Sequence, residues 1–381
     1  MNPMDQLRAA RPAHLDTPVD ERVRAAELSH AMSQARPVRR RRIPARAWGV
    51  GLAGAAAATA VTVAVTATGG AAPAPGAPTA AAPSAPSASG GTQVVRLSAK
   101  QVLLVAAESS LKAKAGSGAY WYVESRSGNA QQVGTKVRYT VNSLDRSEMW
   151  ISRLPETDSW WISQNLGTGP APGSEAAWKQ DGSPTRWTVP AGKKGYSGKL
   201  MIEAKAGKPF GNPINVGDKV FDLAGRNVSV AELQALPTTP AALKTRLLQG
   251  YAGHGTESGE KMDADSWLYQ VTSGLLSDMP VKPAVRAAAY QVLAGLDGVR
   301  SLGEVTDALG RTGQGIGRAE HWSNGQYERQ LIVDPRTGVL LTDQIVAVHA
   351  GGQWAGAKPG TVVNWKSITK AEWTDREPVT P

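Results

Sequence analysis

The chain has 381 residues, 41% of them hydrophobic, with 12 Trp and 8 Tyr, which is enough apolar surface for one sizeable core. It contains no Cys, so disulfide bonds, thiolate catalysis and zinc–thiolate sites are excluded. Half of the formal net charge of +10 lies in residues 1–46, which contain ten Arg and five acidic residues. This uneven distribution argues against a nucleic-acid-binding domain in the rest of the chain.

Residues 1–46 are polar and interrupted by prolines, and we expect them to form a mostly disordered cytoplasmic arm. The arm ends in a basic run, Arg39, Arg40, Arg41, Arg42 and Arg46, which directly precedes an uncharged segment. Such a run orients the following segment in a membrane with its N-terminus in the cytoplasm, and it attracts anionic lipid head groups. Membrane lipids, rather than nucleic acid, are therefore the expected partners of these arginines.

Residues 47–67 are predicted to form a transmembrane helix. The segment carries no charge, and at about 1.5 Å per residue it spans about 32 Å, close to the roughly 30 Å hydrocarbon core of a bilayer. Its composition, rich in Ala, Gly and Thr, also suits the apolar part of a cleaved signal peptide or a buried core helix. The long leader before the segment and the linker after it favour an uncleaved signal anchor. The remainder of the chain would then lie outside the cell.

Residues 68–93 consist almost wholly of Ala, Pro, Gly and Ser, a composition that cannot form a core. Their prolines favour an extended, disordered stalk. This linker marks the boundary between the membrane segment and a single extracytoplasmic domain, residues 94–381.

The first part of this domain is predicted to contain one helix followed by strands. Ser98 can cap a helix that runs to Lys114, with apolar residues at helical spacing. The hydrophobic period then changes to two, which predicts strands at residues 120–123, 137–141, 148–152 and 160–164. Residues 167–221 are rich in Gly and Pro, and we expect long loops there with one strand around Trp187.

A helical block and a second group of strands complete the domain. Pro240, Asp265 and Pro283 are each predicted to open a helix, and the three helices end near residues 249, 276 and 296. Strands are expected at residues 299–306, 315–322, 327–333, 339–348 and 361–368, with a tight hairpin turn at 334–338. This order indicates an α+β fold in which helices pack on an antiparallel sheet.

No motif for catalysis or cofactor binding is apparent. The five His have no partner at metal-ligand spacing, and neither a nucleophile elbow nor a Walker sequence occurs. Asp263 and Asp265 are expected to begin a helix, where acids suit the helix dipole, rather than to bind calcium. Residues 313–317 are rich in Gly, but no helix follows to receive a phosphate, so a bulged strand is expected. The sequence therefore predicts a protein that is not an enzyme and has neither a metal nor a cofactor.

Tryptophan is the one unusual feature of the composition, with 12 Trp against 2 Phe. Several Trp crowd the first group of strands, where they could line an apolar or glycan-binding groove. The competing interpretation is that they simply form the core. The candidate groove residues are Trp121, Trp150, Trp160 and Trp161.

Three segments of the domain, together with the basic run, the Ala-rich span and the stalk, form a familiar combination: Leu236-Pro237-Thr238-Thr239-Pro240, Val285-Arg286-Ala287-Ala288-Ala289-Tyr290 and Leu331-Ile332-Val333-Asp334-Pro335-Arg336-Thr337-Gly338. This combination resembles a group of uncharacterised actinobacterial single-pass membrane proteins, some associated with extracytoplasmic-function sigma factors. The domain is also similar, more distantly, to lipoprotein-carrier and RseB-type domains, which implies a curved sheet that cradles an acyl chain or a peptide. The resemblance implies no catalytic residues, and the arm is shorter than the multi-helix sigma-binding domain typical of anti-sigma factors.

Two functions follow as expectations. The first is a membrane-tethered sensor or regulator, in which the outer domain binds an unknown envelope ligand and residues 1–46 bind a cytoplasmic partner such as a sigma factor. The second is a tethered binding module for lipid, peptide or glycan, whose arm serves only to orient the chain in the membrane. A hydrolase with a scattered site is a distant third.

Overall fold

The computed structural model describes residues 97–190, 199–214, 219–256 and 259–379. The predicted arm (1–46), with its five orienting arginines, the predicted transmembrane helix (47–67) and the linker (68–93) therefore lie outside the described residues, as do residues 94–96 of the domain. Within the described part of the chain, no helix is both long enough and apolar enough to cross a membrane.

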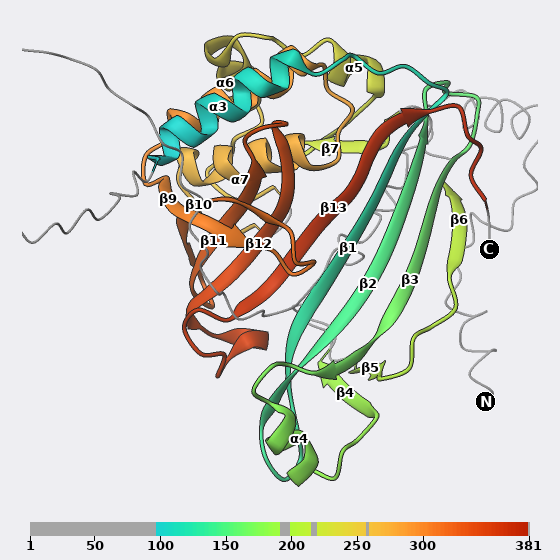
Figure 1. Cartoon of the computed structure of the whole chain (residues 1–381), viewed down its shortest axis with the longest axis vertical. Coiled ribbons are helices and arrows are strands. Elements are labelled where there is room, and N and C mark those ends of the chain that lie inside the picture. Colours follow the sequence, from blue (N-terminus) through green and yellow to red (C-terminus); the bar gives the residue numbers. More distant parts are fainter. Residues whose placement is uncertain (1–96, 191–198, 215–218, 257–258, 380–381) are drawn as a thin grey trace, which may run out of the picture. The chain divides into compact units, whose positions relative to one another are not determined.

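A nine-stranded antiparallel sheet is the main element of the fold, in the order β6-β3-β2-β1-β13-β12-β11-β10-β9 (Figure 1). Its central pair, β1 and β13, joins strands from opposite ends of the domain and so unites an early and a late group of hairpins. Two short hairpins lie outside this sheet, and the α+β class is confirmed. The strands of the main sheet are β1 Tyr120–Val133, β2 Tyr139–Ser152, β3 Ser159–Pro170, β6 Phe210–Ile214, β9 Arg300–Thr306, β10 Thr312–Trp322, β11 Gly325–Asp334, β12 Val339–Ala350 and β13 Val362–Thr374; the hairpins are β4 Arg186–Pro190 with β5 Lys199–Glu203, and β7 Phe221–Leu223 with β8 Arg226–Val228.

The longer helices begin at the capping residues that the sequence indicates. Ser98 forms a capping box with Gln101 at the start of the first helix, and Asp263 caps another by accepting a hydrogen bond from the Ser266 amide. Two further helices begin with Pro in the first turn, where its missing N–H costs no hydrogen bond. The helices are α3 Ala99–Lys112, α4 Glu175–Gln180, α5 Val230–Gln234, α6 Pro240–Leu248, α7 Ala264–Ser277 and α8 Pro283–Ala294, with a short 3-10 turn η3 Gly352–Trp354.

Two predicted details of the strands need correction. Residues 137–141 and 148–152 were expected to be separate strands, but β2 runs without a break from Tyr139 to Ser152. The polar residues between them stay extended because β2 pairs along its length with β1 and β3. The region 167–221 contains the expected strand around Trp187, and it also contains α4, β5 and β6 in place of continuous loops.

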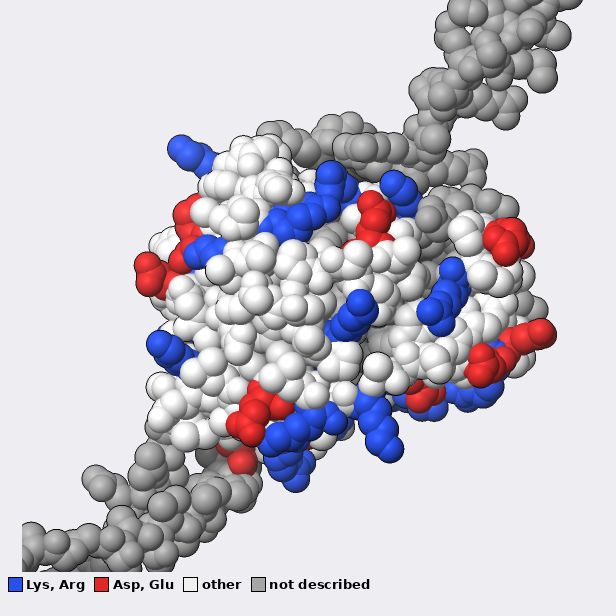
Figure 2. Space-filling model, turned by 90° about the horizontal axis from the view of Figure 1, so that it is seen from above, with Lys and Arg blue, Asp and Glu red and all other residues white. Residues whose placement is uncertain are grey.

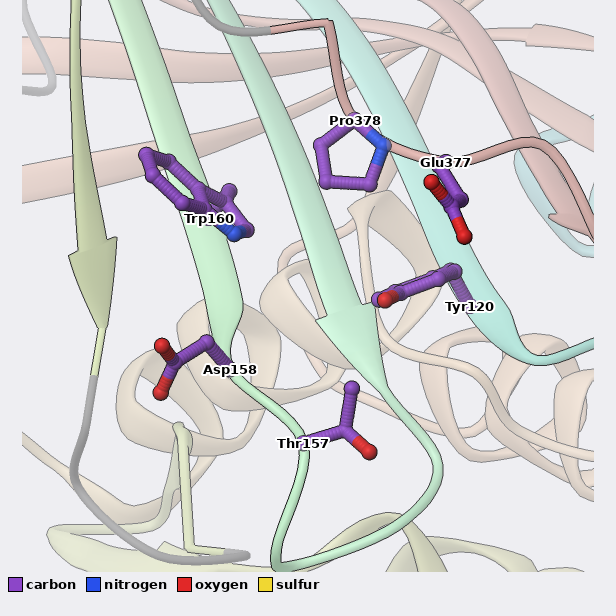
Figure 3. A pocket seen from close by; sticks show the side chains of 6 residues that line it. All are labelled: Tyr120, Thr157, Asp158, Trp160, Glu377 and Pro378. Carbon is purple, nitrogen blue, oxygen red and sulfur yellow. The ribbon is translucent and has the colours of Figure 1, made fainter.

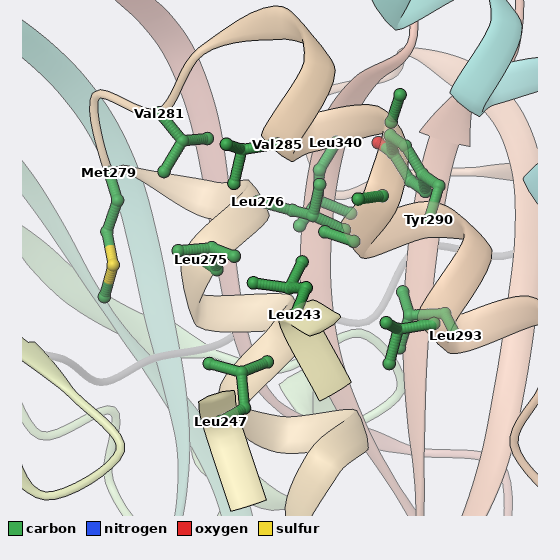
Figure 4. Packing of buried hydrophobic residues seen from close by; sticks show 14 of the residues in the cluster. Leu243, Leu247, Leu275, Leu276, Met279, Val281, Val285, Tyr290, Leu293 and Leu340 are labelled. Atoms are coloured by element: carbon green, nitrogen blue, oxygen red, sulfur yellow. The ribbon is translucent and has the colours of Figure 1, made fainter. Parts of the chain in front are cut away.

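The main core lies between the helices and one face of the sheet. One hydrophobic cluster there contains Leu243 and Leu247 of α6, Leu276 of α7, Leu293 of α8 and Leu340 of β12 (Figure 4). All five side chains are at most 2% exposed, and burying one leucine stabilises a fold by about 1.5–3 kcal/mol. Helices α3, α6 and α7 lie over the β9–β13 part of the sheet, whereas β2, β3 and β6 extend away from them (Figure 1).

The turn between β11 and β12 and the glycine-rich strand β10 form as the sequence predicts. Asp334 accepts a hydrogen bond from the Gly338 amide, and Gly338 has φ +70°, a conformation that favours glycine. A side chain there would also meet Ser110 and the Ala106 backbone of α3, so Gly338 allows the close approach of turn and helix. In β10 the pairing with β9 shifts between Gly315 and Ile316, which is the expected bulge.

Candidate ligand-binding surface

A row of polar side chains crosses five adjacent strands of the main sheet. Asn165 of β3 lies opposite Asp145 of β2, which lies opposite Ser127 of β1. The row continues through Lys366 of β13 to Asp343 of β12. Because directly opposed residues in antiparallel strands point to the same face, these five side chains share one surface, here called the polar row.

The polar row lies on the face that the helices cover. The Lys366 ammonium donates to the Asp278 carboxylate at 2.6 Å, and Asp278 is the C-cap of α7. Three rungs along the same face from the Ser127–Asp145 pair, Trp121 of β1 and Ile151 of β2 belong to the main core. The row therefore continues the core face of the sheet beyond the point where the apolar packing ends.

Polar residues are unexpected on this face, because a sheet that packs against helices normally presents apolar side chains to them. Ser125, Ser127 and Ser147 are each less than 9% exposed. Burying a polar group costs free energy unless it is hydrogen-bonded. The Ser147 hydroxyl accepts a hydrogen bond of 2.8 Å from the Trp161 indole N–H, so the fold itself satisfies part of this polarity. A row of polar side chains on a helix-facing surface still marks it as a candidate for binding.

The charged side chains beside the row are arranged as pairs. The Arg329 guanidinium donates from Nε to Asp343 at 2.9 Å, and a second nitrogen also contacts this carboxylate. Burial alone would lower the pKa of Arg329, but the Asp343 carboxylate and nearby Glu320 raise it, so Arg329 stays cationic. Burial raises the pKa of Asp145, an effect partly offset by the hydrogen bond that Asn165 donates at 3.2 Å.

A cavity of about 290 Å³ lies between α7 and the sheet, next to this charged pair. Gln270 and Gly274 of α7 and Arg329 of β11 are among the residues that line it. Because Arg329 also binds Asp343, the cavity adjoins the polar row. Its other lining residues are Asp222, Leu223, Ala224, Thr256, Val271 and Met279.

Glu320 of β10 is a buried carboxylate beside the cavity. Its Oε2 atom accepts hydrogen bonds from Gln270 at 3.1 Å and from Trp322 at 3.3 Å. Its Oε1 atom is buried and has no hydrogen-bond partner among the described residues. Burial raises the pKa of Glu320, because the charged form is poorly solvated there.

The structure divides the four candidate tryptophans between the two faces of the sheet. Trp121 and Trp161 point to the helix side, where Trp121 donates to the Asp278 carbonyl at 2.7 Å and Trp161 packs against Phe210. Trp150 and Trp160 are opposite each other on the other face. The four side chains therefore do not line one common groove.

Sequence reasoning did not find the polar row. Lys366, Asp343 and Arg329 lie in strands that were predicted, but their alternation with apolar residues does not show which residues of distant strands are neighbours. The available signal was the repeated Ser at alternate positions of β1, Ser125 and Ser127. Polar residues at alternate positions of a strand point to the same face, but this pattern does not show which face the helices cover.

Among the described residues, no three His, Asp or Glu side chains converge in the way that metal ligands do. Comparison of the chain with models of protein families, with curated proteins and with solved structures finds no match.

Proposed function

We propose that this chain is a single-pass membrane protein whose α+β domain binds an amphiphilic ligand outside the cell and reports it through residues 1–46. The observation that carries the proposal is the polar row on the helix-facing side of the sheet. A face that served only to hold helices would gain stability from apolar residues at these positions.

The side chains around the row indicate the chemistry of the ligand. Serine hydroxyls and the Asn165 amide donate and accept hydrogen bonds, so they suit hydroxyl, amide or phosphate-ester groups. On the same face, Met149 and Trp161 form an apolar area next to the row, and Phe210, half exposed, packs on Trp161 at 5.6 Å between ring centres. A ligand with a polar head and an apolar chain or side chain, such as a lipid or an amphiphilic peptide, matches a polar surface that lies next to an apolar one.

The membrane tether and the cytoplasmic partner rest on the sequence. The five arginines before the uncharged span support an N-terminus in the cytoplasm, and the resemblance to sigma-factor-associated proteins supports a sigma factor as the partner of residues 1–46. The alternative is a tethered binding module without signalling, in which the outer domain binds the same class of ligand and the arm binds only lipid head groups.

Ligand binding is tested by purifying the full chain in mild detergent and identifying co-purified lipids and peptides by mass spectrometry. Ser163→Leu introduces a bulky apolar group beside the row, and Gln164→Leu is the matched control on the opposite face of β3. We expect Ser163→Leu, but not Gln164→Leu, to lower the amount of bound ligand severalfold. The same ligand content in both variants would contradict a site on this face.

Signalling is tested separately by capturing cytoplasmic proteins with the full chain and with a version in which residues 1–46 are scrambled. Recovery of a sigma factor only with the native arm supports the regulator. If neither version recovers a cytoplasmic protein while ligand binding persists, the tethered module without signalling is the better account.

A further inference from the structure

The face of the sheet opposite the polar row carries a cluster of aromatic side chains. Tyr122, Trp150 and Trp160 are directly opposed on β1, β2 and β3, and Tyr120 lies next to them on β1. Tyr122 and Trp150 pack with ring centres 4.3 Å apart, and Tyr120 meets Trp150 edge-on at 6.3 Å. Together with Ile162 these residues form a separate hydrophobic cluster, here called the outer aromatic cluster.

A cation already lies on this cluster. The guanidinium carbon of Arg376 is 5.7 Å from the ring centre of Tyr122 and 6.0 Å from that of Trp150. Both distances are within the range of attraction between a cation and an aromatic face. A hydrogen bond of 2.9 Å to Glu372 holds the guanidinium in place. The molecule itself therefore shows that these rings accept an organic cation.

Carboxylates surround the aromatic rings. The Tyr122 hydroxyl donates to Glu148 at 3.0 Å and has the Glu124 carboxylate 3.3 Å away as a second acceptor, and Arg146 pairs with both acids. With two acids and one arginine, this group leaves a net negative charge near the rings, which favours cations over neutral or anionic groups.

A pocket of about 330 Å³ lies at the edge of the cluster, and one of its lining residues, Glu377, directly follows Arg376 in the chain (Figure 3). The rings of Tyr120 and Trp160 form aromatic walls, and Glu377 and Asp158 contribute carboxylates. In Figure 3 the Glu377 side chain lies on the same side of the opening as Tyr120, across from Trp160 and Asp158. Thr157 and Pro378 complete the lining.

We propose that this pocket binds an organic cation, an alkylguanidinium or alkylammonium group such as the end of an arginine or lysine side chain. The aromatic walls would contact the hydrophobic stem and the face of the cation, and the Glu377 carboxylate would pair with its charge. The site is on the opposite face from the polar row, so it does not depend on the proposed function. Arg376 is its neighbour and repels a second cation.

The test measures binding of n-butylguanidinium to the full chain in non-ionic detergent by calorimetry, with 1-pentanol as the neutral compound of similar size. We expect saturable binding of the cation at least about tenfold tighter than binding of the alcohol. Glu377→Gln should weaken cation binding about tenfold, because it removes the paired charge. Glu156→Gln is the control with the same change in charge: Glu156 is an exposed acid on the β2–β3 loop, next to Thr157, and does not line the pocket.

Two further variants separate the site from a general effect of charge or folding. Trp160→Leu should weaken binding, and Trp160→Tyr, which keeps an aromatic wall, should retain it. Arg376→Gln should strengthen binding, because a like charge is removed. The proposal is overturned if the alcohol binds as tightly as the cation. It is also overturned if Glu377→Gln and Glu156→Gln change the affinity for the cation equally, or if Trp160→Leu and Trp160→Tyr change it equally. Comparing the affinities of an Ala-Arg-Ala peptide and of spermidine then shows whether the cation that the pocket binds is a protein side chain or a free polyamine.

Discussion

Tyr269 and Tyr290 are fully buried between the helices and the sheet, and each keeps a hydrogen bond. The Tyr269 hydroxyl donates to the Ile316 carbonyl at 2.9 Å, and the Tyr290 hydroxyl donates to the Gly338 carbonyl at 3.1 Å. Trp121 connects β1 to the end of α7 in the same way through Asp278. In these three residues the aromatic ring fills volume, and its polar atom also connects a helix to a strand or to the β11–β12 turn.

Buried carboxylates make the stability of the fold depend on pH at the residue scale. Burial raises the pKa of Glu320 above its ordinary value of 4.5, so the folded chain holds this proton more tightly than the unfolded chain. The resulting stabilisation is complete below that ordinary pKa and is lost as the pH rises through the raised, folded-state pKa.

Glu320→Gln removes this dependence, because the amide is neutral at every pH. We expect the free energy of unfolding of the variant, relative to that of the unchanged chain, to increase between about pH 5 and pH 8. Urea unfolding followed by tryptophan fluorescence at several pH values measures the difference. A difference that stays constant across this range would show that Glu320 is not the group responsible.

Strand β10 owes its path to glycines on one face. A Cβ added at Gly313 would lie 2.7 Å from the Val333 carbonyl oxygen, and one added at Gly315 would lie 2.6 Å from a Val305 methyl group. These contacts show that β10 passes closer to its neighbours than a strand with side chains on that face could. The glycine-rich segment is thus explained by packing within the sheet, without a phosphate ligand.

At the scale of this element, Gly313→Ala should lower the free energy of unfolding by about 1–3 kcal/mol, because a backbone oxygen cannot move aside as a side chain can. Gly169→Ala in β3 is the matched control, since no heavy atom lies within 4 Å of its added Cβ. That control should change stability by no more than about 0.5 kcal/mol. Chemical denaturation of both variants measures the contrast, and equal losses would contradict the close packing of β10.

At the scale of the whole molecule, the two ends of the folded domain meet in the middle of the sheet. β1 and β13 pair over most of their length although more than two hundred residues separate them. The helical block between them then covers only one part of the resulting face, which leaves the polar row at its margin. Seen from above, the molecule has Lys and Arg interspersed with Asp and Glu on a mainly uncharged surface (Figure 2).

The proposed topology can be tested on intact cells or right-side-out membrane vesicles. Protease added outside should digest the α+β domain and spare residues 1–46, because the membrane shields the arm. Replacing Arg39, Arg40, Arg41, Arg42 and Arg46 with Ala should increase the fraction of chains in the opposite orientation. Digestion of the arm in the unchanged chain would contradict the predicted orientation.

The elements of the fold could be predicted from the sequence where local chemistry decides them. Ser98, Pro240 and Pro283 open helices as expected, and the 334–338 turn joins β11 to β12. The short helix α5 was missed, because five residues are too few to show a helical period. The strand boundary inside β2 was wrong, because pairing with two neighbours keeps its polar centre extended.

The candidate sites were decided by tertiary structure. Composition and hydrophobic period determine which segments become helices or strands, since capping, turn chemistry and alternation act between residues a few positions apart. The register between distant strands is not encoded at that range, so the meeting of Ser127 with Lys366, and of Tyr122 with Arg376, follows only from the β1–β13 pairing and the path of the chain after it. The sequence alone thus determined the class of the fold and most of its longer elements, whereas the assembled sheet decided which polar and aromatic side chains share a face.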